Sequence, residues 1–123
     1  MQVELAHKLA KSNPTIEVEI EKSIEKHNSA DIAIKINQEI IYIEIKLINK
    51  NKSITTSRTT LFNQLSRNRV HGRSIGVVFL GSQDGQVWIE SEIKRLVDKD
   101  KRIMHLGSLY ANKVFSFNLF EYK

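Results

Sequence analysis

The sequence predicts an α/β domain in which helices flank a mixed β-sheet. Apolar and polar residues alternate over three segments between residues 15 and 47, a pattern typical of half-buried strands. Apolar residues recur at helical spacing over 57–71 and 86–99, which predicts two helices that pack on the sheet. The chain has 123 residues, the size of one domain with one core, so we expect residues 1–123 to form a single domain.

The first half of the chain predicts one helix and three strands. A helix is expected near the start, because Leu5 and Leu9 share one helical face and Pro14 lies just beyond its end. The segment "TIEVEIE" alternates strictly and predicts the first strand. The expected elements are a helix at 2–12 and strands at 15–21, 30–36 and 39–47.

The second half predicts helices and strands in alternation. Leu61 and Leu65 would anchor the first of these helices to the sheet. The run "SIGVVFLG" is apolar and short, as expected of a buried strand, and "GSQDG" predicts the turn after it. The expected elements are a helix at 57–71, a strand at 74–81, a helix at 86–99 and a strand at 113–122. The complete order is therefore α-β-β-β-α-β-α-β.

The two middle strands predict a hairpin closed by the two-residue loop Asn37-Gln38. Ile36 then pairs with Glu39, and counting back along both strands puts Asp31 opposite Glu44. Because successive side chains on a strand alternate between faces, this register sorts the hairpin into two sets. The aliphatic face holds Ile32, Ile34, Ile36, Ile41, Ile43, Ile45 and Leu47, and the other face holds Asp31, Ala33, Lys35, Tyr42, Glu44 and Lys46 with Ile40. A slip by one residue would mix the sets, so the pattern supports the register.

This register places the carboxylates of Asp31 and Glu44 against each other. Like charges directly opposed on a sheet are destabilising. At about 5 Å and an effective dielectric constant of ~20, the repulsion is on the order of 3 kcal/mol. A divalent cation between the two groups would turn this repulsion into a binding site. The alternative is a solvated hairpin face with cross-strand ion pairs.

The net charge of +5 is concentrated in one part of the chain. No acidic residue lies between Glu44 and Asp84, and this window holds seven basic residues: Lys46, Lys50, Lys52, Arg58, Arg67, Arg69 and Arg73. Such a concentration of positive charge suits a polyanion such as nucleic acid. The alternative is a solvated basic face with no partner.

Composition excludes several other classes. No apolar run is long enough to span a bilayer, and the N-terminus lacks the apolar stretch of a signal peptide, so we expect a cytoplasmic protein without membrane contact. The chain has no cysteine, which excludes disulfides and thiolate metal sites. The four histidines lack the paired spacing of a zinc site.

The hairpin residues resemble a known motif. Asp31, twelve residues and then Glu44-Ile45-Lys46 lie on consecutive strands followed by a helix. "SADIAI" and "IYIEIKL" are similar to the two motif strands of the PD-(D/E)XK nuclease superfamily, with Ala30 where that family often has proline. The resemblance covers roughly residues 1–80 and implies a restriction-endonuclease-like α-β-β-β-α-β core. A weaker likeness points to archaeal Holliday-junction resolvases.

The resemblance implies a role for each motif residue. Asp31, Glu44 and the main-chain carbonyl of Ile45 would bind Mg²⁺, with Mn²⁺ as a substitute, because hard cations prefer oxygen ligands. Lys46 would orient or deprotonate the attacking water beside the metal. Two further catalytic candidates are Glu4, as an extra acidic residue on the first helix, and Gln64, as a polar residue on the helix after the motif. As alternatives, Glu4 pairs with Lys8 on the helix surface and Gln64 simply faces solvent.

Together these features predict a Mg²⁺-dependent endonuclease that hydrolyses DNA phosphodiester bonds, directed by nucleic-acid structure or backbone rather than by sequence. The residues expected to bind nucleic acid are Lys50, Lys52, Arg58, Arg67, Arg69 and Arg73. Two alternatives stay open: a non-catalytic nucleic-acid-binding module on a nuclease fold, and an RNA-cleaving or partner-dependent nuclease subunit. The tail strand is apolar on both faces, which suggests a homodimer. The alternative for the tail is a strand inside its own sheet whose phenylalanines fill the core.

Overall fold

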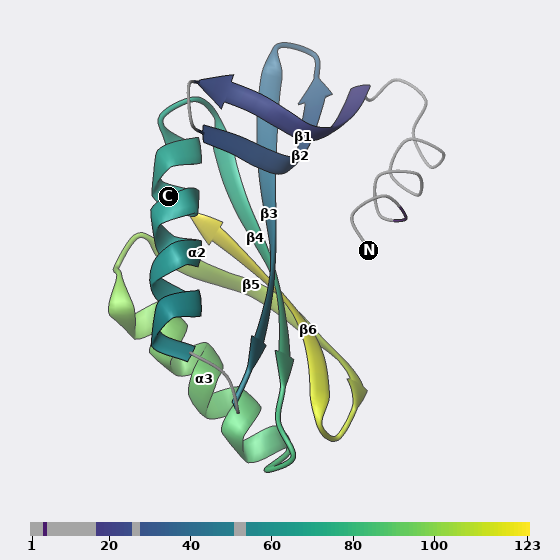
Figure 1. Cartoon of the computed structure of the whole chain (residues 1–123), viewed down its shortest axis with the longest axis vertical. Coiled ribbons are helices and arrows are strands. Elements are labelled where there is room, and N and C mark those ends of the chain that lie inside the picture. Colours follow the sequence, from purple (N-terminus) through teal and green to yellow (C-terminus); the bar gives the residue numbers. More distant parts are fainter. Residues whose placement is uncertain (1–3, 5–16, 26–27, 51–53) are drawn as a thin grey trace.

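The computed structural model describes Glu4 and residues 17–25, 28–50 and 54–123. Within residues 17–123 of this described part, six strands form one mixed sheet, accompanied by two helices (Figure 1). The strands are β1 Glu17–Glu25, β2 Asn28–Ile36, β3 Glu39–Asn49, β4 Arg73–Gly81, β5 Ile103–Asn112 and β6 Phe115–Tyr122, and the helices are α2 Ile54–Arg69 and α3 Gln86–Lys99. The predicted α/β class with a mixed sheet is confirmed.

The spatial order of the strands is β1-β2-β3-β4-β6-β5. β3 and β4 are parallel and are joined by α2, whereas every other neighbouring pair is antiparallel. Parallel neighbours need a crossover connection, and α2 supplies it. This arrangement places α2 over β4 and over β3, the strand that carries Glu44, Ile45 and Lys46.

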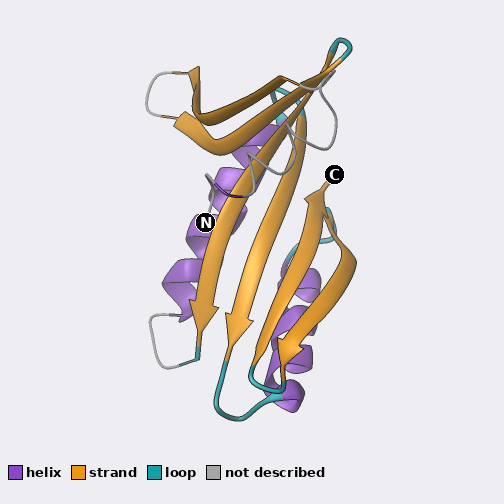
Figure 2. Ribbon diagram, turned by 90° about the vertical axis from the view of Figure 1, so that its right-hand side faces the viewer, coloured by secondary structure: helices purple, strands orange, loops and turns teal. Residues whose placement is uncertain are grey.

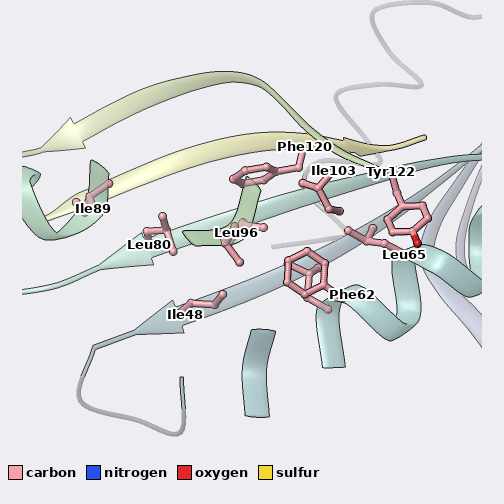
Figure 3. Packing of buried hydrophobic residues seen from close by; sticks show 11 residues of the cluster. Ile48, Phe62, Leu65, Leu80, Ile89, Leu96, Ile103, Phe120 and Tyr122 are labelled. Atoms are coloured by element: carbon pink, nitrogen blue, oxygen red, sulfur yellow. The ribbon is translucent and has the colours of Figure 1, made fainter. Parts of the chain in front are cut away.

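Both helices lie on the same side of the sheet, and Figure 2 shows the opposite face with the helices behind the strands. The helix-side core joins α2 and α3 to β3, β4, β5 and β6, as Figure 3 shows. Its buried members are Ile48, Leu61, Phe62, Leu65, Val78, Leu80, Ile89, Leu96, Ile103, Phe120 and Tyr122. A second buried cluster lies on the other face and includes Ile32, Ile34, Ile43, Ile75 and Val77.

Most predicted elements occur close to their expected bounds. α3 spans 86–99 as predicted, whereas α2 begins three residues before the predicted helix and ends two residues earlier. The hairpin strands β2 and β3 extend each predicted strand by two residues away from the turn. The predicted helix at 2–12 lies outside the described residues except for Glu4, whose backbone is helical.

The strand β5 was not predicted, although it spans ten residues. Its pairing with β6 shifts between His105 and Gly107 and again between Tyr110 and Asn112. Each irregularity interrupts the two-residue alternation on which strand prediction depends. The sequence pattern of β5 is therefore not the simple one of a half-buried strand.

The tail strand β6 lies inside the sheet, between β4 and β5. The alternative of a tail strand paired within its own sheet is therefore confirmed. Phe120 is buried in the helix-side core, while Phe117 and Leu119 pack on the opposite face. The homodimer stays a prediction.

Candidate functional site

The hairpin has the predicted register. Asn37 adopts a left-handed backbone with φ of 55°, as a tight two-residue turn requires. Pairing runs from Ile36 opposite Glu39 to Ile32 opposite Ile43. Asp31 and Glu44 are the next residues along the two strands, at the point where this pairing stops.

Where the backbone pairing of β2 and β3 ends, the side chain of Asp31 forms the next hydrogen bond to β3. Its carboxylate oxygen Oδ2 accepts a hydrogen bond from the backbone N–H of Ile45 at 2.8 Å. The Asp31 side chain thus satisfies a main-chain donor of β3 and is held next to Glu44. Asp31, Glu44 and Ile45, the three residues expected to hold a metal, lie together in the structure.

Glu44 is almost completely buried, with 2% of its surface exposed. Burial raises the pKa of its carboxyl group from 4.5 to about 7. The hydrogen bond from Asn68 opposes this rise, the charge and hydrogen bond of Asp31 add to it, and the Lys46 ammonium opposes it again. Below pH 7 the metal-free site therefore retains a proton on Glu44.

Asn68 of α2 is the direct partner of Glu44. Its side-chain Nδ2 donates a hydrogen bond to Glu44 Oε1 at 3.0 Å, and the residue is fully buried. Gln64, one helical turn earlier, was predicted from the sequence instead, and Asn68 was not. The signal was present, because Asn68 follows Leu61 and Leu65 at positions i+7 and i+3 and so shares their core-facing side.

Close backbone packing holds α2 above Glu44. A side chain at Gly72 would meet the carbonyl oxygen of Ile40 at 2.5 Å, so the turn after α2 needs glycine there. Gly76 lies opposite Glu44 on β4, and a Cβ at this position would meet Leu65 at 3.3 Å. The buried hydroxyl of Ser74 donates to the carbonyl of Leu65 at 2.7 Å. These contacts fix the helix position that brings Asn68 to Glu44.

The structure also describes the other predicted catalytic residues, Lys46, Gln64 and Glu4. Lys46 follows Glu44 by two residues, is half-buried, and is close enough to lower the pKa of Glu44. Gln64 is half-buried on α2, one turn before Asn68. Glu4 is exposed and is not among the described groups that shift the pKa of Glu44.

Three of the predicted nucleic-acid-binding residues form ion pairs with carboxylates that come later in the sequence than this basic window, the stretch between Glu44 and Asp84. Arg58 forms a bidentate pair with Glu92 of α3, whose side chain is 1% exposed. Arg73 donates to both carboxylate oxygens of Glu121, at 3.0 and 3.1 Å. Lys50 pairs with Asp84, and Lys52 lies outside the described residues. The positive charge of the window is therefore partly neutralised in the folded chain.

Arg67 and Arg69 differ from these three cations. Both are exposed in the last turn of α2, and in the described part of the chain neither has a carboxylate within ion-pair distance. Arg69 donates to the carbonyl oxygen of Gly72 at 3.3 Å. They flank Asn68 in sequence, so the exposed cations lie on the same helical turn as the residue that contacts Glu44.

The donor set at this site suits a hard cation. The described residues contain no group of three or more histidine, aspartate or glutamate side chains that could hold a metal. Mg²⁺, however, is commonly held by one or two carboxylates and keeps several waters. Two facing carboxyl groups, one of them buried and hard to ionise, match that requirement and gain from a positive charge.

Comparisons with family models, with curated proteins and with solved structures found no match. Among the described helices, none is both long and apolar enough to cross a membrane.

Proposed function

We propose that this protein is a Mg²⁺-dependent endonuclease that hydrolyses DNA phosphodiester bonds on a restriction-endonuclease-like core. The proposal depends chiefly on the facing carboxyl groups of Asp31 and Glu44, because their repulsion and the burial of Glu44 are costly without a cation. The order β1-β2-β3-α2-β4 supports it, since these elements carry the motif residues and the basic helix turn in the sequence order of that class.

Each residue has a defined part in this proposal. Asp31, Glu44 and the main-chain carbonyl of Ile45 would hold Mg²⁺, with Mn²⁺ as a substitute. The bound cation would polarise the phosphate and lower the pKa of the attacking water. Lys46 would orient or deprotonate that water and stabilise negative charge on the phosphate.

Arg67 and Arg69 would bind the phosphate backbone beside this site. Contacts to phosphates position a nucleic acid without reading its sequence, which favours recognition of structure or backbone. The natural substrate would therefore be a branched or otherwise shaped DNA, with RNA as the substrate to be tested against it.

A direct assay tests the proposal. Purified protein is incubated with four-way junctions, linear duplex, single-stranded DNA and RNA, with Mg²⁺, Mn²⁺ or EDTA. We expect cleavage of DNA with either metal and none with EDTA. Absence of cleavage of all four substrates in both metals would refute the nuclease.

Lys46→Ala is expected to bind DNA but not to cut it. One lysine supplies one of several phosphate-neutralising charges, so affinity in EDTA should fall by no more than about threefold. Proton transfer and charge stabilisation at the water would disappear, which lowers the cleavage rate by about a hundredfold or more. Single-turnover cleavage and filter binding measure the two effects, with Lys35→Ala on the same hairpin as the control. Near-normal turnover would remove Lys46 from the mechanism.

Reversing Arg67 and Arg69 to glutamate together is expected to weaken binding similarly for all DNA sequences. The dependence of log affinity on log salt concentration should become shallower by about 1 for each phosphate that the protein no longer neutralises. The matched control is Lys94→Glu with Arg95→Glu, two exposed residues on α3 that give the same change in net charge. Equal falls in affinity for both double variants would mean that only overall charge matters and that the α2 turn is not the binding surface.

A further inference from the structure

Asn68 is a polar residue where the helix pattern calls for an apolar one. The buried residues of α2 are Leu61, Phe62, Leu65 and Asn68, and all but Phe62 are at most 1% exposed. Asparagine has lower helix propensity than leucine, and burying its amide removes water from four hydrogen-bonding positions. A leucine at this position would complete the apolar face.

Among the described residues, only one end of the Asn68 side-chain amide has a hydrogen-bond partner. Nδ2 donates to Glu44 Oε1, but among the described residues the buried Oδ1 has no hydrogen-bond partner. A buried acceptor without a partner is costly, and native structures contain few of them. Folding alone therefore does not account for an asparagine here, and the contact with Glu44 is the one hydrogen bond found for its side chain within the described part of the chain.

That contact acts on the carboxyl group expected to bind the cation. The Asn68 amide donates to this carboxyl group at 3.0 Å, as hydrogen-bond partners of metal ligands commonly do. It also engages one of the two carboxylate oxygens and so restricts rotation of the group. The packing at Gly72 and Ser74 keeps α2, and with it Asn68, in place.

We infer that Asn68 is a positioning residue that presents the Glu44 carboxylate to a divalent cation shared with Asp31. This inference rests on the proposed function. Hydrogen-bond partners of metal ligands commonly contribute about ten- to a hundredfold to metal affinity. This role requires a hydrogen-bond donor in the side chain of residue 68 and depends less on the shape of that side chain.

Metal affinity of the free protein tests the inference without any cleavage. Isothermal titration with Mg²⁺ and Mn²⁺ at pH 8 compares wild type, Asn68→Ala and Asn68→Leu, which is similar in size and lacks the donor. Both variants are expected to bind about tenfold more weakly or worse. The control is Asn63→Ala, an exposed asparagine on the same helix, and it should match wild type.

The outcomes separate this inference from the proposed function. If wild type binds metal and both Asn68 variants bind within twofold of it, Asn68 has no positioning role and the nuclease proposal stands. If wild type binds neither metal, both fail.

A metal-free measurement covers the case in which an Asn68 variant folds poorly. Urea unfolding at pH 8 compares the effect of Asn68→Ala in wild type and in Glu44→Gln. We expect the variant to change the unfolding equilibrium constant at least about fivefold more in wild type, because hydrogen bonds to charged groups are the stronger ones. Equal effects in the two backgrounds would show that Asn68 only fills space.

Discussion

Asp31→Ala and Glu44→Ala are each expected to lower the cleavage rate at saturating Mg²⁺ by at least about a thousandfold, because a catalytic metal supplies several kcal/mol of transition-state stabilisation. Each substitution removes one of the two carboxyl groups that face each other at the end of the β2–β3 pairing. The cation would lose both a ligand and half of the negative charge that attracts it.

Both variants should remain folded. Asp31→Ala removes one hydrogen bond to the backbone of Ile45, a loss of about 1 kcal/mol that the relief of carboxylate repulsion offsets. Glu44→Ala removes a buried acid together with its cost of ionisation. Circular dichroism and single-turnover cleavage measure fold and rate, and Asp98→Ala on α3 is the control. Wild-type cleavage by either variant would exclude its carboxylate from the site.

The hairpin was predictable because the residues that determine its register lie within one short stretch of the sequence. A two-residue loop fixes which residues pair, and the aliphatic alternation supports one register, in which all the isoleucines of residues 30–47 except Ile40 share a face. The structure has this register from Ile36 opposite Glu39 to Ile32 opposite Ile43. The proximity of Asp31 to Glu44 follows from the register alone.

The contact between Asn68 and Glu44 was not predictable in the same way, because the two residues are 24 positions apart. It depends on the position of α2 on the sheet. The close approach of the Gly72 backbone to the carbonyl oxygen of Ile40 helps to set this position. The helical spacing from Leu61 indicates that Asn68 faces inward, but it does not indicate which residue it meets.

The ion pairs of the basic window, the stretch between Glu44 and Asp84, were also not predictable, because their partners are far away in the sequence. Its seven cations are unopposed in sequence, yet Asp84, Glu92 and Glu121 reach three of them in the folded chain. A one-dimensional charge count cannot include carboxylates that the fold brings from later elements. Exposure and pairing in three dimensions leave Arg67 and Arg69 as the described members best placed to meet a phosphate.

Glu44→Gln is expected to stabilise the metal-free protein at pH 8 by about 3 kcal/mol, since each tenfold change in an acid dissociation constant is worth about 1.36 kcal/mol. The folded-state pKa of Glu44 is about 7, above its ordinary value of 4.5. Between these two pH values the folded chain binds more protons than the unfolded chain. Its stability therefore falls as pH rises through this range, and above pH 7 the full cost of the buried carboxylate is present.

Urea unfolding of both proteins at pH 5 and pH 8 in EDTA measures this cost. At pH 5 the folded wild type carries a protonated Glu44, so the two free energies of unfolding should differ by less than about 1 kcal/mol. At pH 8 the variant should be the more stable protein. Because the two proteins share every other titrating group, the difference between their free energies of unfolding reports on Glu44. Saturating Mg²⁺ at pH 8 should then stabilise wild type much more than the variant, because the cation binds the ionised carboxylate. A variant that is less stable than wild type at pH 8 would show that the Glu44 carboxylate is not strained in the metal-free fold, and the main physical argument for a cation at this site would fail.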